Sequence, residues 1–133
     1  TAHLRLKPRR NITSAVKDNP PESSENIDSS LLLEMKIRRP EMLLLDVRES
    51  GERESVSIGG LHIPLRELPD HIDMLPRDHP IVCYCKSGSR SLRAALFLQD
   101  QGFSEAFSLK GGVMGLTPVE KQRLQDMDAL HDD

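Results

Sequence analysis

Residues 81–92, IVCYCKSGSRSL, are the part of this chain from which the other predictions start. The stretch begins as an apolar run of the kind that forms buried strands, and it then enters a loop of small and polar residues. Beyond Leu92, apolar residues recur at helical spacing, and Gly102 stands at the expected end of that helix. Residues 81–102 therefore predict a strand, a tight loop and a helix.

The loop has the character of an anion-binding site built around a thiol. A strand–loop–helix points backbone N–H groups and the positive end of the helix dipole into the loop. Cys85 lies at the mouth of this loop, and Lys86 and Arg90 add positive charge beside it. Such surroundings favour the thiolate, so we predict that Cys85 is a catalytic nucleophile. The loop residues expected to hold its substrate are Lys86, Ser87, Gly88, Ser89, Arg90 and Ser91.

Arg90 and Cys83 need separate interpretations. Two roles are open for Arg90, attraction of an anionic substrate or a structural clamp on the loop, because it falls in the first turn of the predicted helix. Cys83 is expected to be an inert core residue, because free cysteines are commonly buried. We expect no disulfide between Cys83 and Cys85, since residues two apart on a strand lie near the upper limit of bridging distance.

A second apolar run, residues 42–47, predicts a strand that is buried on both faces. Asp46 near its end must be hydrogen-bonded or paired, because an isolated buried carboxylate is costly. We expect Asp46 to orient the neighbouring loops, and Arg48 either braces Asp46 or holds an anionic substrate. Because ligands bind at the carboxyl ends of parallel strands, Asp46, Arg48 and Cys85 are all expected at one edge of a sheet.

Residues 85–90, CKSGSR, resemble the active-site loop of rhodanese-like sulfurtransferases. Residues 44–52, 58–65 and 102–113 are similar to the other motifs of that family, in the same order. The resemblance covers about residues 27–116. It agrees with the alternation of strands and helices, which predicts a single α/β domain with a mostly parallel sheet and helices on both faces.

The resemblance implies a sulfurtransferase that forms a persulfide on Cys85 from a small sulfane-sulfur donor and needs no metal or cofactor. The linker and the second motif resemble the C-terminal part of adenylyltransferase–sulfurtransferase fusions. This implies a ubiquitin-like sulfur-carrier protein as the acceptor and an adenylyltransferase domain upstream. One alternative is a Cys-dependent phosphatase, but those enzymes place five residues between Cys and Arg, and here four separate Cys85 from Arg90. The other is a non-catalytic interaction module, against which the retained Cys85 argues.

Composition excludes several classes of protein. The net charge is −3, and with scattered basic residues and only 3% aromatic residues we expect no binding to nucleic acid. No apolar run is long enough to span a bilayer, so no membrane association is expected. Two cysteines cannot build a disulfide framework, which favours a reducing, cytoplasmic setting. The chain begins with Thr1, and we expect it to be a fragment of a longer protein.

The chain divides into three predicted parts: an extension and linker over residues 1–26, the domain over residues 27–116, and a C-terminal helix with an acidic tail over residues 117–133. The weak alternation at Leu4 and Leu6 predicts a short strand in the extension. Further helices are expected from an Asp28 cap to Arg38, over Ser50–Ser55, over Leu65–Leu75 with a break at Pro69 and a cap at Asp70, and from a Thr117 capping box to Leu130. Further strands are expected over Leu61–Ile63 and Ala106–Leu109.

Overall fold

A computed structural model of the chain describes residues 25–55 and 58–131. These residues form a five-stranded sheet with the strand order β1-β5-β4-β2-β3, in which every neighbouring pair is parallel. The strands are β1 (Asn26–Ile27), β2 (Leu43–Asp46), β3 (Leu61–His62), β4 (Ile81–Tyr84) and β5 (Ala106–Leu109).

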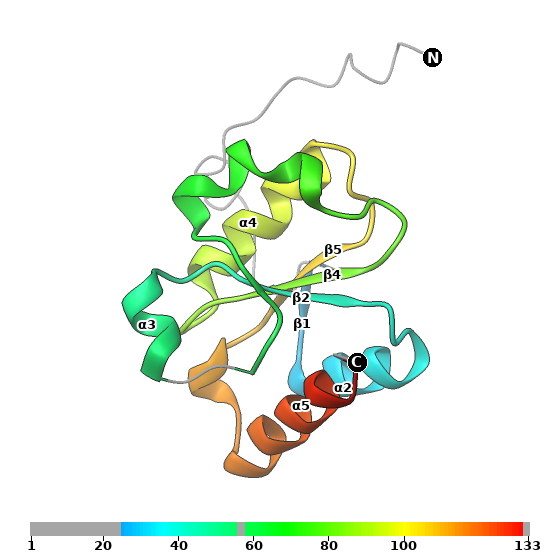
Figure 1. Cartoon of the computed structure of the whole chain (residues 1–133), viewed down its shortest axis with the longest axis vertical. Helices are drawn as coiled ribbons and strands as arrows, with labels where there is room; N and C mark the ends of the chain where they lie inside the picture. The colour runs from blue at the N-terminus through cyan, green and yellow to red at the C-terminus, as the bar shows by residue number, and fades with distance from the viewer. Residues whose placement is uncertain (1–24, 56–57, 132–133) are drawn as a thin grey trace.

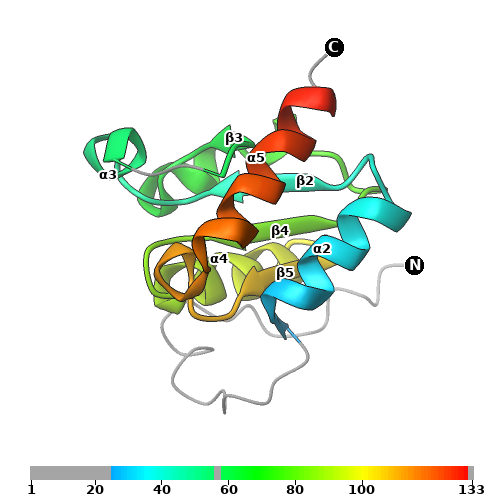
Figure 2. The ribbon, with the colours of Figure 1, turned by 90° about the horizontal axis from the view of Figure 1, so that it is seen from below.

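Helices cover both faces of this sheet (Figures 1 and 2). One face carries α4 (Ser89–Asp100) with the 3₁₀ helices η2 (Leu65–Asp70) and η3 (Ile72–Met74). The other carries α2 (Ser29–Arg38) and α5 (Pro118–His131), while α3 (Ser50–Ser55) and η4 (Val113–Gly115) lie at the end of the sheet. The predicted α/β architecture, with a parallel sheet covered on both sides, is confirmed.

The central strand β4 shows why the sheet needs two layers of helices. All four of its residues are buried. Ile81 and Cys83 belong to the core cluster on the α4 side, and Val82 and Tyr84 belong to the cluster on the α2 and α5 side. Because successive side chains of a strand point to opposite faces, an apolar run of this kind is stable only between two helical layers.

The predicted N-terminal caps of α2 and α5 are confirmed. The Asp28 carboxylate accepts a hydrogen bond from Leu31 N at 2.9 Å at the start of α2. At the start of α5, Glu120 N donates to Thr117 Oγ1 at 3.1 Å, and Thr117 N donates to Glu120 Oε1 at 2.9 Å. Glu120 also accepts a bond from Ser29 Oγ at 2.8 Å, which joins the first turns of α5 and α2.

The predicted helix over residues 65–75 is wrong in two respects. Two 3₁₀ helices stand there, and Pro69 lies inside η2 rather than at a break. The φ that proline imposes suits 3₁₀ geometry, so proline is tolerated in a turn that no α-helix continues. The chain turns at His71 instead, and no side chain caps η3, so Asp70 is not the predicted cap.

Strand β1 was not predicted, because two residues are too short for any periodic pattern. It pairs with β5 through Asn26 opposite Ser108 and Ile27 opposite Leu109. The predicted strand at Leu4 and Leu6 lies outside the described residues, as does the linker up to residue 24.

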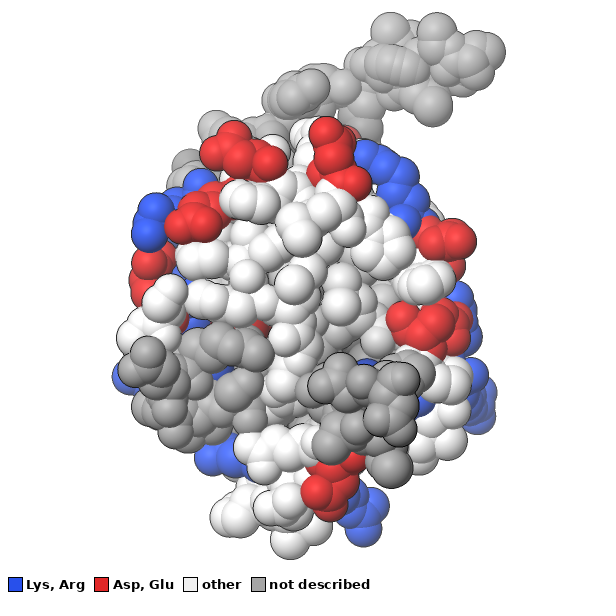
Figure 3. Space-filling view, viewed as in Figure 1, with Lys and Arg blue, Asp and Glu red and all other residues white. Residues whose placement is uncertain are grey.

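Charged side chains on the described surface are mixed in sign. Figure 3 shows acidic and basic residues interspersed around the edge of one face, so that face carries no broad field of one sign. Over the part of the chain that the structure describes, every helix is too short or too polar to cross a bilayer.

Candidate active site

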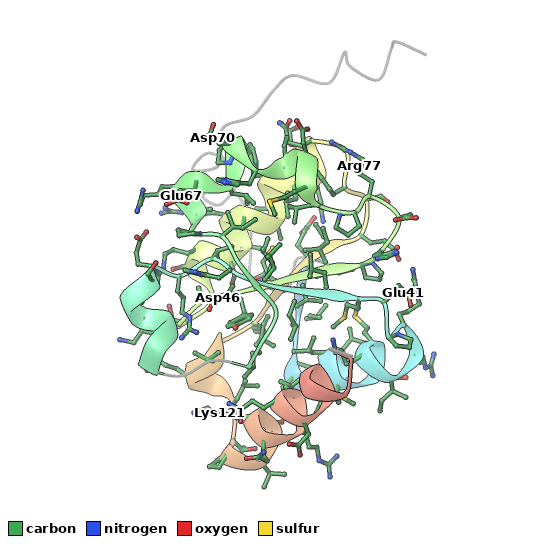
Figure 4. The ribbon with its side chains drawn as sticks, viewed as in Figure 1. Glu41, Asp46, Glu67, Asp70, Arg77 and Lys121 are labelled. Carbon is green, nitrogen blue, oxygen red and sulfur yellow. The ribbon has the colours of Figure 1, made fainter. Side chains whose placement is uncertain are left out.

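The site lies where the central strands of the sheet end. Asp46 at the end of β2 stands opposite Tyr84 at the end of β4, so Asp46 and the following Cys85 come to the same edge. Figure 4 shows Asp46 at the end of the sheet nearest α3. The active-site loop, residues 85–88, joins β4 to α4.

Cys85 points its sulfur into the loop. Its Sγ accepts hydrogen bonds from Gly88 N at 3.1 Å and from Ser91 N at 3.4 Å, and it lies 3.5 Å from Ser91 Oγ. These donors belong to the N-cap and the first turn of α4, where free N–H groups and the helix dipole stabilise negative charge. The residue is fully buried (0% exposed), so the sulfur occupies the base of the loop.

A second turn, Gly111-Gly112, packs against the active-site loop. Val113 N donates to Cys85 O and Met114 N donates to Lys86 O, both at 3.0 Å. Gly112 has φ 62°, and a Cβ there would collide with the carbonyl oxygens of those same two loop residues. Glycine is therefore required for the two loops to approach this closely.

Gly88, like Gly112, has a backbone conformation with a positive φ. It is the N-cap of α4 with φ 106° and ψ −14°, in the left-handed region. This conformation turns its N–H toward Cys85 Sγ. The remaining predicted loop residues Lys86, Ser87 and Ser89 have exposed side chains, so they lie on the outer side of the loop.

Arg90 pairs with Glu52 of α3. Its Nη1 and Nη2 lie 2.7 and 2.8 Å from Glu52 Oε1 and Oε2, which is a two-point ion pair. The bond from Arg90, together with one from the N–H of Glu49, lowers the pKa of Glu52 to about 2. Of the two roles open for Arg90, the geometry shows the clamp, because its charge is already matched. Glu52 lies in residues 44–52, which are similar to a motif of the family, but no spacing rule links it to Arg90 across 38 positions.

Asp46 and Arg48 form a buried ion pair. Arg48 Nε lies 2.9 Å from Asp46 Oδ1 and Nη2 lies 2.9 Å from Oδ2, with side chains 3% and 0% exposed. Burial opposes the charge of Arg48, but the Asp46 carboxylate outweighs burial and raises the pKa of Arg48. The guanidinium also lies over the Tyr84 ring, 5.4 Å from its centre. The structure therefore shows Arg48 bracing Asp46, which is one of the two roles expected for Arg48.

His62 and Cys83 are structural. His62 Nε2 lies 2.7 Å from Arg48 O, which ties β3 to the segment after β2. Cys83 is a free, fully buried thiol, and burial raises its pKa well above the ordinary value. The prediction that Cys83 is an inert core residue is confirmed, and the structure contains no disulfide between it and Cys85.

Ser108 is a site residue that sequence analysis missed. Its Oγ lies 2.8 Å from Ser91 Oγ, and both residues are fully buried. The available signal was a hydroxyl within the otherwise apolar strand Ala106–Leu109. Within residues 25–55 and 58–131, no cluster of three or more His, Cys, Asp or Glu side chains is arranged to hold a metal ion.

A model of the rhodanese-like domain matches residues 29–117. The chain is 32% identical over 89 residues to a sulfurtransferase of Allochromatium vinosum, covering 66% of this chain and 83% of that protein. It is 36% identical over 77 residues to the thiosulfate sulfurtransferase GlpE of Stutzerimonas stutzeri, covering 57% and 71%. The crystal structure of a rhodanese-related protein from Thermoplasma volcanium superimposes with a TM-score of 0.61 at 32% identity, covering 68% of this chain and 87% of that one.

Proposed function

Because the chain belongs to the rhodanese-like domain family, we propose that it is a sulfurtransferase that carries sulfur on Cys85. The observation that carries the proposal is the position of Cys85 Sγ, within hydrogen-bonding distance of two N–H groups at the start of α4. Relatives named sulfurtransferase and thiosulfate sulfurtransferase support the same activity.

The first step is attack of the Cys85 thiolate on the outer sulfur of a sulfane donor such as thiosulfate. A bond forms between Sγ and that sulfur, the sulfur–sulfur bond of the donor breaks, and its electron pair leaves with sulfite. The product is the persulfide Cys85–S–S⁻, and we expect the N–H groups of residues 86–91 to hold its charge. Donors pre-aimed at a developing charge each contribute about 2–4 kcal/mol when water is excluded.

The donor reaches the sulfur from the outer side of the loop. Cys85 has no exposed surface (0%), so the loop must open locally before Sγ can attack the donor. Lys86 has an exposed side chain on that side, and its charge attracts an anionic donor. Arg90 contributes less attraction than its charge suggests, because Glu52 is bound to it.

In the second step a nucleophilic acceptor takes the outer sulfur, and Cys85 leaves as the thiolate. A ubiquitin-like sulfur-carrier protein, adenylated by an upstream domain in a cytoplasmic setting, is the acceptor that the linker and second motif favour. This part of the proposal rests on resemblance alone. It is checked by incubating the persulfide form with an adenylated carrier and measuring thiocarboxylate at the carrier's C-terminus.

The ion pair between Arg90 and Glu52 disfavours the alternative that the protein is a Cys-dependent phosphatase. A phosphatase loop needs its arginine free to bind the phosphoryl oxygens with both nitrogens. Here both terminal nitrogens of Arg90 are bonded to Glu52, and the loop is one residue shorter than those enzymes require.

Intact-protein mass spectrometry after exposure to thiosulfate tests the proposal. The protein should gain one sulfur atom, the Cys85→Ser variant should gain none, and the matched Cys83→Ala variant should gain it as the parent does. Thiosulfate:cyanide exchange should follow the same pattern, without hydrolysis of p-nitrophenyl phosphate. A protein that folds but gains no sulfur would be a non-catalytic interaction module.

A further inference from the structure

The buried hydroxyls of Ser91 and Ser108 form a hydrogen bond with each other behind Cys85. Counting the hydrogens and acceptors around them shows which hydroxyl is the donor. Ser108 Oγ is fully buried, and Ser91 Oγ, at 2.8 Å, is the hydrogen-bond partner that the described residues offer it. A buried hydroxyl hydrogen without an acceptor is costly. Ser108 therefore donates its hydrogen to Ser91 Oγ.

Ser91 is then left with one hydrogen and two acceptors within reach. Those acceptors are Gly88 O at 3.2 Å and Cys85 Sγ at 3.5 Å. When Cys85 carries a proton, the thiol donates to Ser91 Oγ, and the Ser91 hydrogen points to Gly88 O. When Cys85 is a thiolate, the Ser91 hydrogen rotates to the sulfur, because a hydrogen bond to an ionised acceptor is the stronger one.

We propose that Ser108 is a positioning residue, which holds Ser91 as a hydrogen-bond donor toward the Cys85 thiolate. The inference rests on the proposed function in that Cys85 is its nucleophile. Because Ser108 fills one lone pair of Ser91 Oγ, it polarises the Ser91 hydroxyl and strengthens the bond that hydroxyl makes to sulfur. Ser108 itself does not touch the sulfur.

This arrangement distinguishes the states of the sulfur. In the persulfide the negative charge lies on the outer sulfur, so Sγ is neutral and the bond from Ser91 weakens. The hydroxyl pair thus favours the thiolate over both the thiol and the persulfide. It promotes formation of the nucleophile in the first step and departure of Cys85 as a leaving group in the second.

The test is the pH profile of Cys85 alkylation by iodoacetamide, read by mass spectrometry of the peptide that contains Cys85. This reaction needs neither donor nor acceptor, so it does not depend on whether the chain transfers sulfur. In the Ser108→Ala variant we expect the midpoint of the profile to move to higher pH by about half a unit, which is about a three-fold change in the ionisation constant.

At high pH the same variant should react as fast as the parent or faster, because a thiolate with weaker hydrogen bonds is more nucleophilic. A merely structural role, in which the loop closes or shifts, would lower this plateau without moving the midpoint. Two further variants complete the design. Ser104→Ala makes the same chemical change at an exposed position before β5 and should leave the profile unchanged.

Ser108→Thr keeps the hydroxyl and should restore the midpoint of the parent. The proposal is overturned if Ser108→Ala leaves the midpoint where it was, whatever happens to the plateau. It is equally overturned if both Ser108 variants move the midpoint to the same extent, because the effect would then come from packing. Far-UV circular dichroism of each variant verifies that the profiles compare folded proteins.

Discussion

The ion pair between Arg90 and Glu52 allows the sharpest test of how the active-site loop is held. Arg90 stands in the first turn of α4, next to the loop, and Glu52 lies on α3. Replacing Glu52 by Gln keeps the shape of the side chain but removes the charge and leaves the guanidinium unmatched beside Cys85. We expect the Glu52→Gln variant to be less stable at neutral pH.

The expected loss follows from the pKa of Glu52. A shift from 4.5 to about 2 would correspond to about 3 kcal/mol if the pair were shielded from water. The two side chains are 31% and 34% exposed, so solvent screening reduces this value. We therefore expect the variant to lose about 1 kcal/mol of unfolding free energy at pH 7.

The sign of the pH dependence is equally definite. A carboxyl whose pKa folding lowers stabilises the folded state above its ordinary pKa, and that contribution is lost as pH falls through the folded value. The difference between the parent and the Glu52→Gln variant should be complete above pH 4.5 and should shrink toward zero near pH 2. Urea unfolding followed by circular dichroism at several pH values measures it.

Glu34→Gln is the matched control. Glu34 forms an ion pair with Arg38 at 2.8 Å on the surface of α2, but the two side chains are 52% and 73% exposed. Such a pair contributes about 0.5 kcal/mol or less. The reasoning is refuted if the two Gln variants are equally stable at pH 7, or if the deficit of the Glu52 variant persists unchanged at pH 2.

The remaining predictions concern the glycine turn and the buried ion pair. Gly112→Ala should lose at least about 2 kcal/mol of unfolding free energy and form less persulfide, since its Cβ collides with the loop and its φ is positive. The control is Gly115→Ala, where a Cβ meets nothing within 4 Å. It should change neither the stability nor the persulfide formed. Asp46→Asn should lose about 3 kcal/mol in urea unfolding, because the buried guanidinium of Arg48 no longer faces the charge of the Asp46 carboxylate. The exposed Asp73→Asn is its control, and equal stability of the two Asn variants would contradict a buried pair.

Much of the fold could be predicted because its signals are local. The apolar run of residues 81–85 and the helical spacing after it describe β4 and α4 almost to the residue. The caps at Asp28 and Thr117 involve partners three positions away, so their spacing is visible in the sequence. Around Pro69 the local pattern fits both an α-helix with a break and a pair of 3₁₀ helices, and the 3₁₀ helices were not predicted.

The sequence by itself determined most of the strands and helices and the loop between β4 and α4, because each depends on neighbours within a few positions. Only the tertiary structure decided which role Arg90 takes and that Ser108 stands behind the sulfur. Their partners are 38 and 17 positions away in the chain. A hydrogen bond or an ion pair depends on distances below 4 Å. Those distances are set by the packing of helices on the sheet and not by the spacing of residues along the chain.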